Sequence, residues 1–135
     1  MAKLREEQKI DLVRIASEVR KWAYVPYSKY SVGAAVLTES GRIYDGVNIE
    51  NAAFPVTVCA ERTAIFKAVS NGEQKFQAIA VVTKDGGMPC GSCRQVMAEF
   101  SPHMLVIVAD DSGRITAEKE LAELLPGMFS AESLE

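Results

Sequence analysis

The chain has 135 residues, of which 48% are hydrophobic and 24% charged. This composition excludes a disordered chain and suits one compact domain spanning residues 1–135. No apolar run approaches the roughly 20 residues that a membrane-spanning helix needs. The 15 basic and 18 acidic residues give a formal net charge of −3, which provides no basic footprint for nucleic acid. We therefore expect neither a membrane nor a nucleic acid as partner.

The N-terminus and the cysteine content indicate a cytoplasmic protein. Residues 1–7 become charged at once and contain no apolar stretch of the kind that a signal peptide requires. The chain has three cysteines, an odd number that cannot form a closed set of disulfides. In a reducing compartment, thiols more often bind metals or take part in catalysis.

The first part of the chain combines a helical pattern with a hairpin pattern. Apolar residues at helical spacing across residues 6–23, from Leu12 to Trp22, predict an amphipathic helix. Two strands are expected at residues 31–37 and 42–48, joined by a glycine-containing turn. Small residues on both faces of the first strand indicate that helices pack closely on each side of it.

The remainder of the chain alternates helices with strands. The expected elements are a helix at 59–70, a strand at 76–83, a helix at 91–100, a strand at 104–109, an edge strand near 114–116 and a helical turn at 121–125. The nearly continuous apolar run at 76–83 indicates a central strand that is buried on both faces. Because right-handed crossovers make the later strands parallel, this order predicts a layered helix/sheet/helix α/β domain.

All three thiols fall at the predicted starts of helices. Cys59 opens one helix, and Cys90 and Cys93 form a Cys-x-x-Cys pair at the next. A helix N-terminus offers free N–H groups and the positive end of the helix dipole, both of which stabilise a thiolate. Three thiolates bind a tetrahedral zinc ion and leave its fourth position open to water, as in a catalytic zinc site.

Each of these features has a simpler explanation when it is taken alone. Cys59 by itself is most often a small buried hydrophobe, and Cys-x-x-Cys by itself is a redox pair or half of a structural zinc site. A structural site needs a fourth ligand, and nothing places the only histidine, His103, near the thiols. A redox pair explains neither Cys59 nor the nearby Glu61.

Glu61 follows Cys59 by two residues, and such residues do not face the same way within a helix. If Cys59 is the N-cap, with non-helical dihedrals, Glu61 in the first turn can lie alongside the ion. A first-turn glutamate is also common because the helix dipole favours it. The combination of ligands, an open position and a proton carrier is more specific than its parts.

The pattern Cys-Ala-Glu followed by Pro-Cys-x-x-Cys resembles the zinc-dependent nucleoside deaminases. Further blocks resemble the small bacterial-type cytidine deaminases, and they lie at 24–30, 32–35, 48–52, 59–64, 89–95 and 124–127. The resemblance implies a three-layer helix/sheet/helix sandwich with a mixed five-stranded sheet. It also implies a homotetramer whose active sites are completed by neighbouring subunits.

The resemblance assigns the metal centre residue by residue. It implies that Cys59, Cys90 and Cys93 bind Zn²⁺, one ion per subunit. Glu61 then carries protons while a zinc-activated water attacks C4 of cytosine. Arg62 is expected to hydrogen-bond the ligand sulfurs and offset their negative charge. Without the resemblance, Arg62 is simply a surface arginine in a charged helical turn.

The same resemblance assigns substrate contacts. Asn48 and Glu50, which alternate onto one face of the strand, are expected to bind the ribose hydroxyls. Ala60 would donate its backbone N–H to the pyrimidine carbonyl. Tyr30 would form an aromatic wall at the substrate's edge, where the family often has phenylalanine. Phe129 would stack on the base from a neighbouring subunit, although a hydrophobic plug in the C-terminal tail explains it equally well.

The implied activity is hydrolytic deamination of cytidine and 2′-deoxycytidine to uridine and 2′-deoxyuridine, with release of ammonia, in pyrimidine salvage. An aminonucleoside-antibiotic deaminase of the blasticidin type is the nearest alternative, but Asn-Ile-Glu-Asn at 48–51 favours the cytidine branch. Deaminases of single-stranded nucleic acid need basic, aromatic grooves, which do not suit an acidic chain. A non-catalytic zinc-stabilised module has no use for an open position beside Glu61.

Overall fold

The computed structural model describes residues 4–134; residues 1–3, which belong to the charged N-terminus discussed above, and residue 135 lie outside this part. The helices and strands are α1 (Glu6–Val19), β1 (Gly33–Thr38), β2 (Ile43–Val47), α2 (Ala60–Ser70), β3 (Phe76–Val82), α3 (Gly91–Phe100), β4 (Leu105–Ala109), β5 (Ile115–Glu120) and α4 (Leu121–Leu124). Among residues 4–134, no helix combines the length and the hydropathy needed to cross a membrane.

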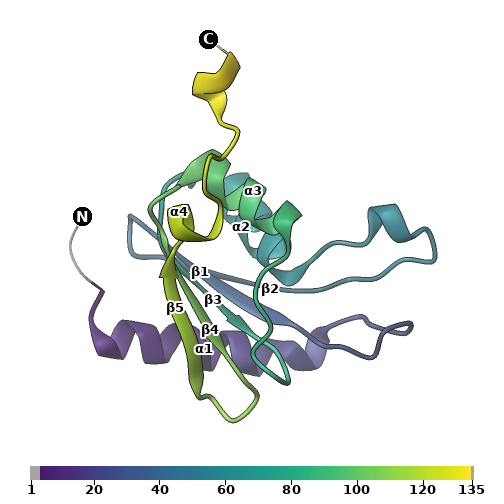
Figure 1. The fold of residues 1–135 in the computed structure, drawn as a ribbon. Coiled ribbons are helices and arrows are strands. Elements are labelled where there is room, and N and C mark those ends of the chain that lie inside the picture. The colour runs from purple at the N-terminus through teal and green to yellow at the C-terminus, as the bar shows by residue number, and fades with distance from the viewer. Residues whose placement is uncertain (1–3, 135) are drawn as a thin grey trace.

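The five strands form one mixed sheet in the order β2-β1-β3-β4-β5. β3 and β4, joined through α3, run parallel, and all other neighbours are antiparallel. Helix α1 covers one face of the sheet, whereas α2, α3 and α4 lie on the other (Figure 1). The predicted three-layer sandwich is therefore confirmed. The expected parallel pairing holds for β3 and β4, while β5 follows β4 through a turn and consequently pairs antiparallel.

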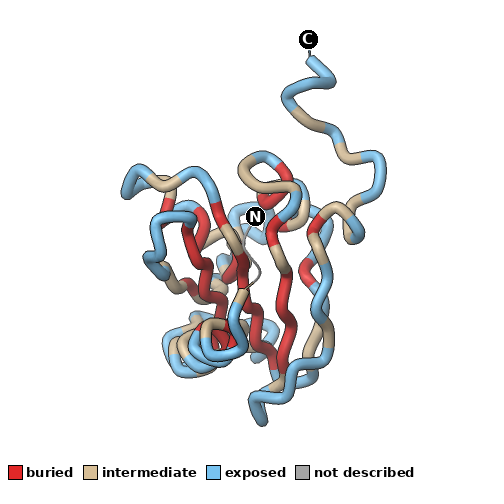
Figure 2. The backbone as a smooth tube through the Cα atoms, turned by 90° about the vertical axis from the view of Figure 1, so that its left-hand side faces the viewer, coloured by how far each residue is buried: buried red, intermediate tan, exposed pale blue. Residues whose placement is uncertain are grey.

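β1 contributes to the cores on both sides of the sheet. Ala34 and Val36 pack in the cluster under α2 and α3, whereas Ala35 and Leu37 pack in the cluster under α1. All positions of the strand are buried, and Figure 2 shows that buried residues concentrate along the strands of the sheet. The prediction that helices pack closely on both faces of this strand is confirmed.

Two elements end more than two residues away from their predicted ends. Helix α1 ends at Val19 and a 3-10 turn, Arg20–Trp22, follows, so the side chain of Trp22 is 71% exposed instead of joining the apolar face. The tighter 3-10 turn changes the angular spacing of side chains, which breaks the 3.6-residue pattern. β5 extends from Ile115 to Glu120, beyond the expected 114–116, because its exposed charged residues hide the strand pattern.

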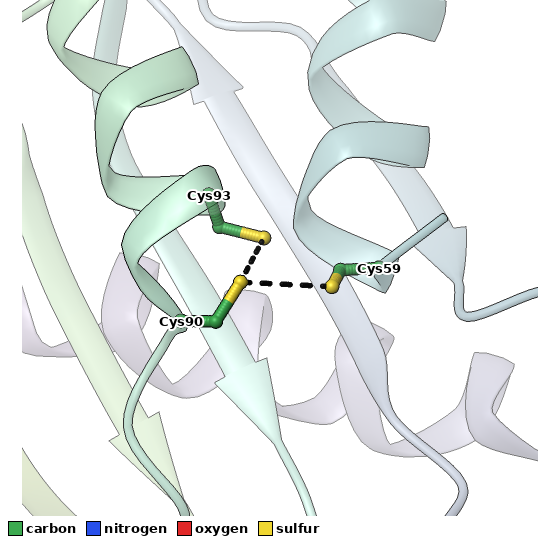
Figure 3. A group of neighbouring side chains, drawn as sticks. All are labelled: Cys59, Cys90 and Cys93. Carbon is green, nitrogen blue, oxygen red and sulfur yellow. Dashed lines mark hydrogen bonds between the residues drawn. The ribbon is translucent and has the colours of Figure 1, made fainter. Parts of the chain in front are cut away.

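The segments that form the site meet at one edge of the sheet, where β1 begins and β2 and β3 end. Gly33, at the start of β1, pairs with Val47 at the end of β2 and with Val82 at the end of β3. Helices α2 and α3 begin above this edge (Figure 3). Helix α2 lies very close to β2, since a Cβ on Gly46 would be 2.5 Å from the backbone nitrogen of Ala64. The absence of a side chain at Gly46 thus allows the first turns of α2 to lie directly against β2.

Candidate active site

Three cysteine sulfurs converge above the sheet edge (Figure 3). Cys59 is the N-cap of α2, Cys90 is the N-cap of α3, and Cys93 lies in the first turn of α3. The Cys90 sulfur is 3.8 Å from that of Cys59 and 3.5 Å from that of Cys93, and all three sulfurs lie within 4.8 Å of one another. All three cysteines are free.

This arrangement fits a zinc ion. Zn–S bonds of about 2.3 Å in tetrahedral geometry place the sulfurs about 3.8 Å apart, close to the observed separations. A hydrogen bond with Cys93, together with the Arg62 guanidinium, lowers the pKa of the Cys59 thiol to about 5. The hydrogen bond to Cys59 and burial raise the pKa of Cys93, so one proton is retained that a bound metal would displace.

Arg62 supplies positive charge beside the sulfurs. Its Nη2 lies 3.4 Å from the Cys59 sulfur and donates to the Thr57 carbonyl at 3.5 Å. Its Nε is buried and has no hydrogen-bond partner among the described residues. An anionic sulfur cluster is the kind of neighbour that this half-buried cation favours. The position of Arg62 therefore agrees with the expected contact to a ligand sulfur.

Glu61 lies in the first turn of α2 and is only 4% exposed. The N-cap residue Cys59 has φ −76° and ψ 154°, which confirms the extended N-cap conformation that the sequence argument required. Burial raises the pKa of the Glu61 carboxyl. A carboxyl with a raised pKa is suited to holding and releasing a proton near neutral pH.

A cleft of about 270 Å³ adjoins the cysteine cluster. Six of the residues predicted for the site line it: Tyr30, Asn48, Glu50, Cys59, Glu61 and Cys90. Several other residues that line the cleft were not predicted from the sequence, including Ser28, Thr83, Gly87 and Met88. Thr83 could have been predicted from the sequence, because it directly follows the buried strand β3. Ligands commonly bind at the carboxyl ends of strands in α/β sheets.

Asn48 and Glu50 hold one wall of the cleft. The Asn48 amide donates to the Tyr30 carbonyl at 2.8 Å and accepts from the Val32 N–H at 2.9 Å. The Glu50 carboxylate accepts the N–H groups of Tyr27 and Ser28 at 3.0 and 3.1 Å, and it also accepts the Ser28 hydroxyl. These bonds lower the pKa of Glu50, so its carboxylate stays ionised.

The other predicted residues lie in different surroundings. Ala60 is the first residue of α2 and is fully buried. Phe129 is 58% exposed in the C-terminal tail, where its carbonyl accepts a hydrogen bond from Gln95, and its side chain does not line the cleft of its own chain. His103 pairs with Glu120 and lies outside the cysteine cluster.

The fold and the three-sulfur site are those of a zinc-binding deaminase. Residues 6–109 match the family described as the cytidine and deoxycytidylate deaminase zinc-binding region, and the chain belongs to this family.

Individual relatives agree with this assignment. A cytidine deaminase of Sporosarcina psychrophila is 53% identical over 126 residues, which cover 91% of this chain and 92% of that protein. A crystal structure of cytidine deaminase from Burkholderia pseudomallei has 39% identity and a TM-score of 0.85, covering 93% of this chain and 100% of that one. A blasticidin-S deaminase of Bacillus cereus is more distant, with 34% identity over 130 residues, or 89% of this chain and 91% of that protein.

Proposed function

We propose that this protein deaminates cytidine and 2′-deoxycytidine hydrolytically, giving uridine and 2′-deoxyuridine with release of ammonia. The observation that carries the proposal is the buried Glu61 carboxyl, which shares one cleft with Cys59 and Cys90 of the sulfur cluster and with Asn48 and Glu50. The cleft therefore combines metal ligands, a proton carrier and polar groups suited to a sugar.

Cys59, Cys90 and Cys93 hold the zinc ion, and Glu61 moves the protons. Zinc supplies the Lewis acidity that makes a water molecule nucleophilic near neutral pH. As this water forms a bond to C4 of the base, the Glu61 carboxylate accepts its proton and passes it to N3. Glu61 then accepts the remaining proton of the added oxygen and gives it to the amino group. The C4–N bond breaks and ammonia leaves.

Asn48 and Glu50 are the proposed contacts to the ribose. The bonds that each makes to its own chain leave hydrogen-bonding capacity, because an amide and a carboxylate each offer about four sites. Polar groups that lose their partner when the sugar is missing would discriminate against the free base. Ala60 is the proposed backbone donor to the pyrimidine carbonyl, since the first N–H groups of a helix have no partner within it.

The proposed assembly is a homotetramer in which each chain is one deaminase domain and each site is completed by a neighbour. The C-terminal tail extends away from the body of its own chain (Figures 1 and 2). An exposed Phe129 in such a tail is available to stack on a base in another subunit. Light scattering combined with activity measurements tests this assembly. A fully active monomer would contradict it.

The cytoplasm is the proposed location, because three free thiols that must remain reduced to bind a metal suit a reducing compartment. The products fit a role in pyrimidine salvage.

The decisive experiment incubates the zinc-loaded protein with cytidine, 2′-deoxycytidine, deoxycytidylate and blasticidin S. Absorbance changes and released ammonia are followed for each compound. We expect turnover of the two nucleosides. The Glu61→Gln variant is the matched control, because it removes the carboxylate while keeping all three sulfurs. No ammonia from either nucleoside, or a clear preference for blasticidin S, would refute the proposal.

A further inference from the structure

Two segments of the chain form opposite walls of the cleft, and hydrogen bonds fix the conformation of each. One wall is the segment 27–32, which Asn48 and Glu50 fasten through its backbone. The other wall is the segment 83–90, which leads from the end of β3 to the metal-binding residue Cys90. The geometry of the cleft depends on how these walls are placed relative to each other.

Thr83 organises the second wall. Its hydroxyl oxygen accepts the N–H groups of Gly86 and Gly87, each at 2.8 Å, and its hydroxyl donates to the Asp85 carboxylate at 3.3 Å. Thr83 is 3% exposed, so this turn is anchored on a buried side chain. The turn presents the Asp85 carboxylate toward the first wall.

A side-chain hydrogen bond joins the two walls. The Tyr30 hydroxyl donates to Asp85 Oδ1 at 2.6 Å, which links segment 27–32 to segment 83–90. The bond lowers the pKa of Asp85, while burial followed by this bond raises the pKa of Tyr30. The ring of Tyr30 lines the cleft, whereas Asp85 does not.

Gly87 makes room for this contact. A Cβ at position 87 would lie 2.9 Å from the Tyr30 hydroxyl oxygen, closer than real Cβ atoms normally approach. The other two nearest atoms, on Asp85 and Thr83, would be 3.7 and 3.9 Å away, which is ordinary contact. A methyl group at position 87 would therefore displace the Tyr30 hydroxyl from its present place.

We infer that Asp85 is a positioning residue for nucleoside binding, which acts through Tyr30 by fixing the distance between the two walls of the cleft. This inference rests on the proposed deamination of cytidine. Asp85 does not touch the substrate, and its effect reaches the substrate through the aromatic ring that it holds. Nucleoside affinity, rather than zinc content or the chemical step, depends on the contact.

A double-mutant cycle tests the contact. Tyr30→Phe removes the hydroxyl and Asp85→Ala removes its acceptor, so each raises the KM for cytidine about three- to tenfold, the equivalent of one ordinary net hydrogen bond. The double variant is no worse than either single variant, because both remove the same contact. Asp85→Asn retains an acceptor oxygen and keeps KM near the wild-type value. Zinc content stays at one per chain and kcat stays within about twofold.

Matched controls separate this contact from general effects. Tyr44→Phe and Asp111→Ala are the controls, because Tyr44 packs against the core under α2 and α3, Asp111 lies beside α1, and neither residue lines the cleft; both variants leave KM unchanged. Gly87→Ala raises KM when Tyr30 is present but costs nothing further in the Tyr30→Phe background, where the obstructing oxygen is gone.

Several results would overturn the inference. These are an unchanged KM in Tyr30→Phe, additive losses in the double variant, a KM increase that follows loss of zinc, and an equal cost of Gly87→Ala in both backgrounds. The cycle is also measured as the equilibrium Kd for cytidine. A wild-type chain that binds cytidine without releasing ammonia would refute the proposed function alone, whereas a chain that does not bind it would refute both.

Discussion

Replacing Gly46 by alanine tests how the sheet positions the active site. The added Cβ would lie 2.5 Å from the Ala64 nitrogen and 2.8 Å from the Ala60 carbonyl oxygen. Ordinary contact begins at 3.4 Å, so the shortest of these distances is too small by about 0.9 Å. Both atoms belong to the backbone of α2, which cannot rotate aside as a side chain can. The helix must therefore move away from β2.

The expected cost follows from this displacement. Overpacking a close-packed interior costs about 1–3 kcal/mol, and a clash with the backbone places Gly46→Ala at about 2–3 kcal/mol. For a domain of this size, such a loss lowers Tm by about 6–12 °C. Because Ala60 directly follows Cys59, which is a proposed zinc ligand, we expect the displacement also to weaken zinc binding. The rise in Tm that zinc produces should then be smaller than in the wild type.

Thermal unfolding of zinc-loaded and chelator-treated protein measures both effects. Gly91→Ala is the control, since a Cβ there has open space around it and no positive φ, and its stability should change by less than about 0.5 kcal/mol. If Gly46→Ala unfolds within about 2 °C of the wild type, the close approach of α2 to β2 does not position the site, and the reasoning fails.

Three further predictions concern the metal centre. Glu61→Gln should keep one zinc per chain while kcat falls by about 10²–10⁴-fold, and full activity in a zinc-replete variant would reject Glu61 as the proton carrier. Arg62→Gln should also keep zinc yet deaminate more slowly, because the thiolate charge is no longer offset beside Cys59; an unchanged steady-state rate would contradict this role. Chelation should abolish activity and lower Tm, and added Zn²⁺ but not Mg²⁺ should restore both, since thiolates prefer the softer ion.

The grouping of the three cysteines was predictable from the sequence because the patterns that indicate it are local. Cys59 and Cys90 each occupy a helix N-cap, and the Cys-x-x-Cys spacing places Cys93 one turn further on. Helix α2 packs mainly against β2 and β1, and α3 joins the parallel strands β3 and β4, so both helices lie on the same face of the sheet. Local pattern and chain topology together bring the three sulfurs to one place.

No local sequence pattern predicts the contact between Tyr30 and Asp85. The two residues are 55 positions apart, and neither belongs to a periodic pattern or to a helix terminus. Their meeting depends on the turn that Thr83 forms after β3 and on the way Asn48 fastens the segment that contains Tyr30. These are tertiary hydrogen bonds between irregular segments, for which the residue types alone give no spacing rule.

The charge balance of the site leads us to expect that zinc stabilises the fold as well as supplying chemistry. Three sulfurs and the Glu61 carboxyl lie together, and Arg62 is the cation in direct contact with the cluster. The N-termini of α2 and α3 add partial positive charge, but the metal-free cluster still keeps a proton on Cys93. A zinc ion held by Cys59, Cys90 and Cys93 would displace that proton and join the starts of both helices. We therefore expect the metal to stabilise the same helix termini that place Glu61 in the cleft.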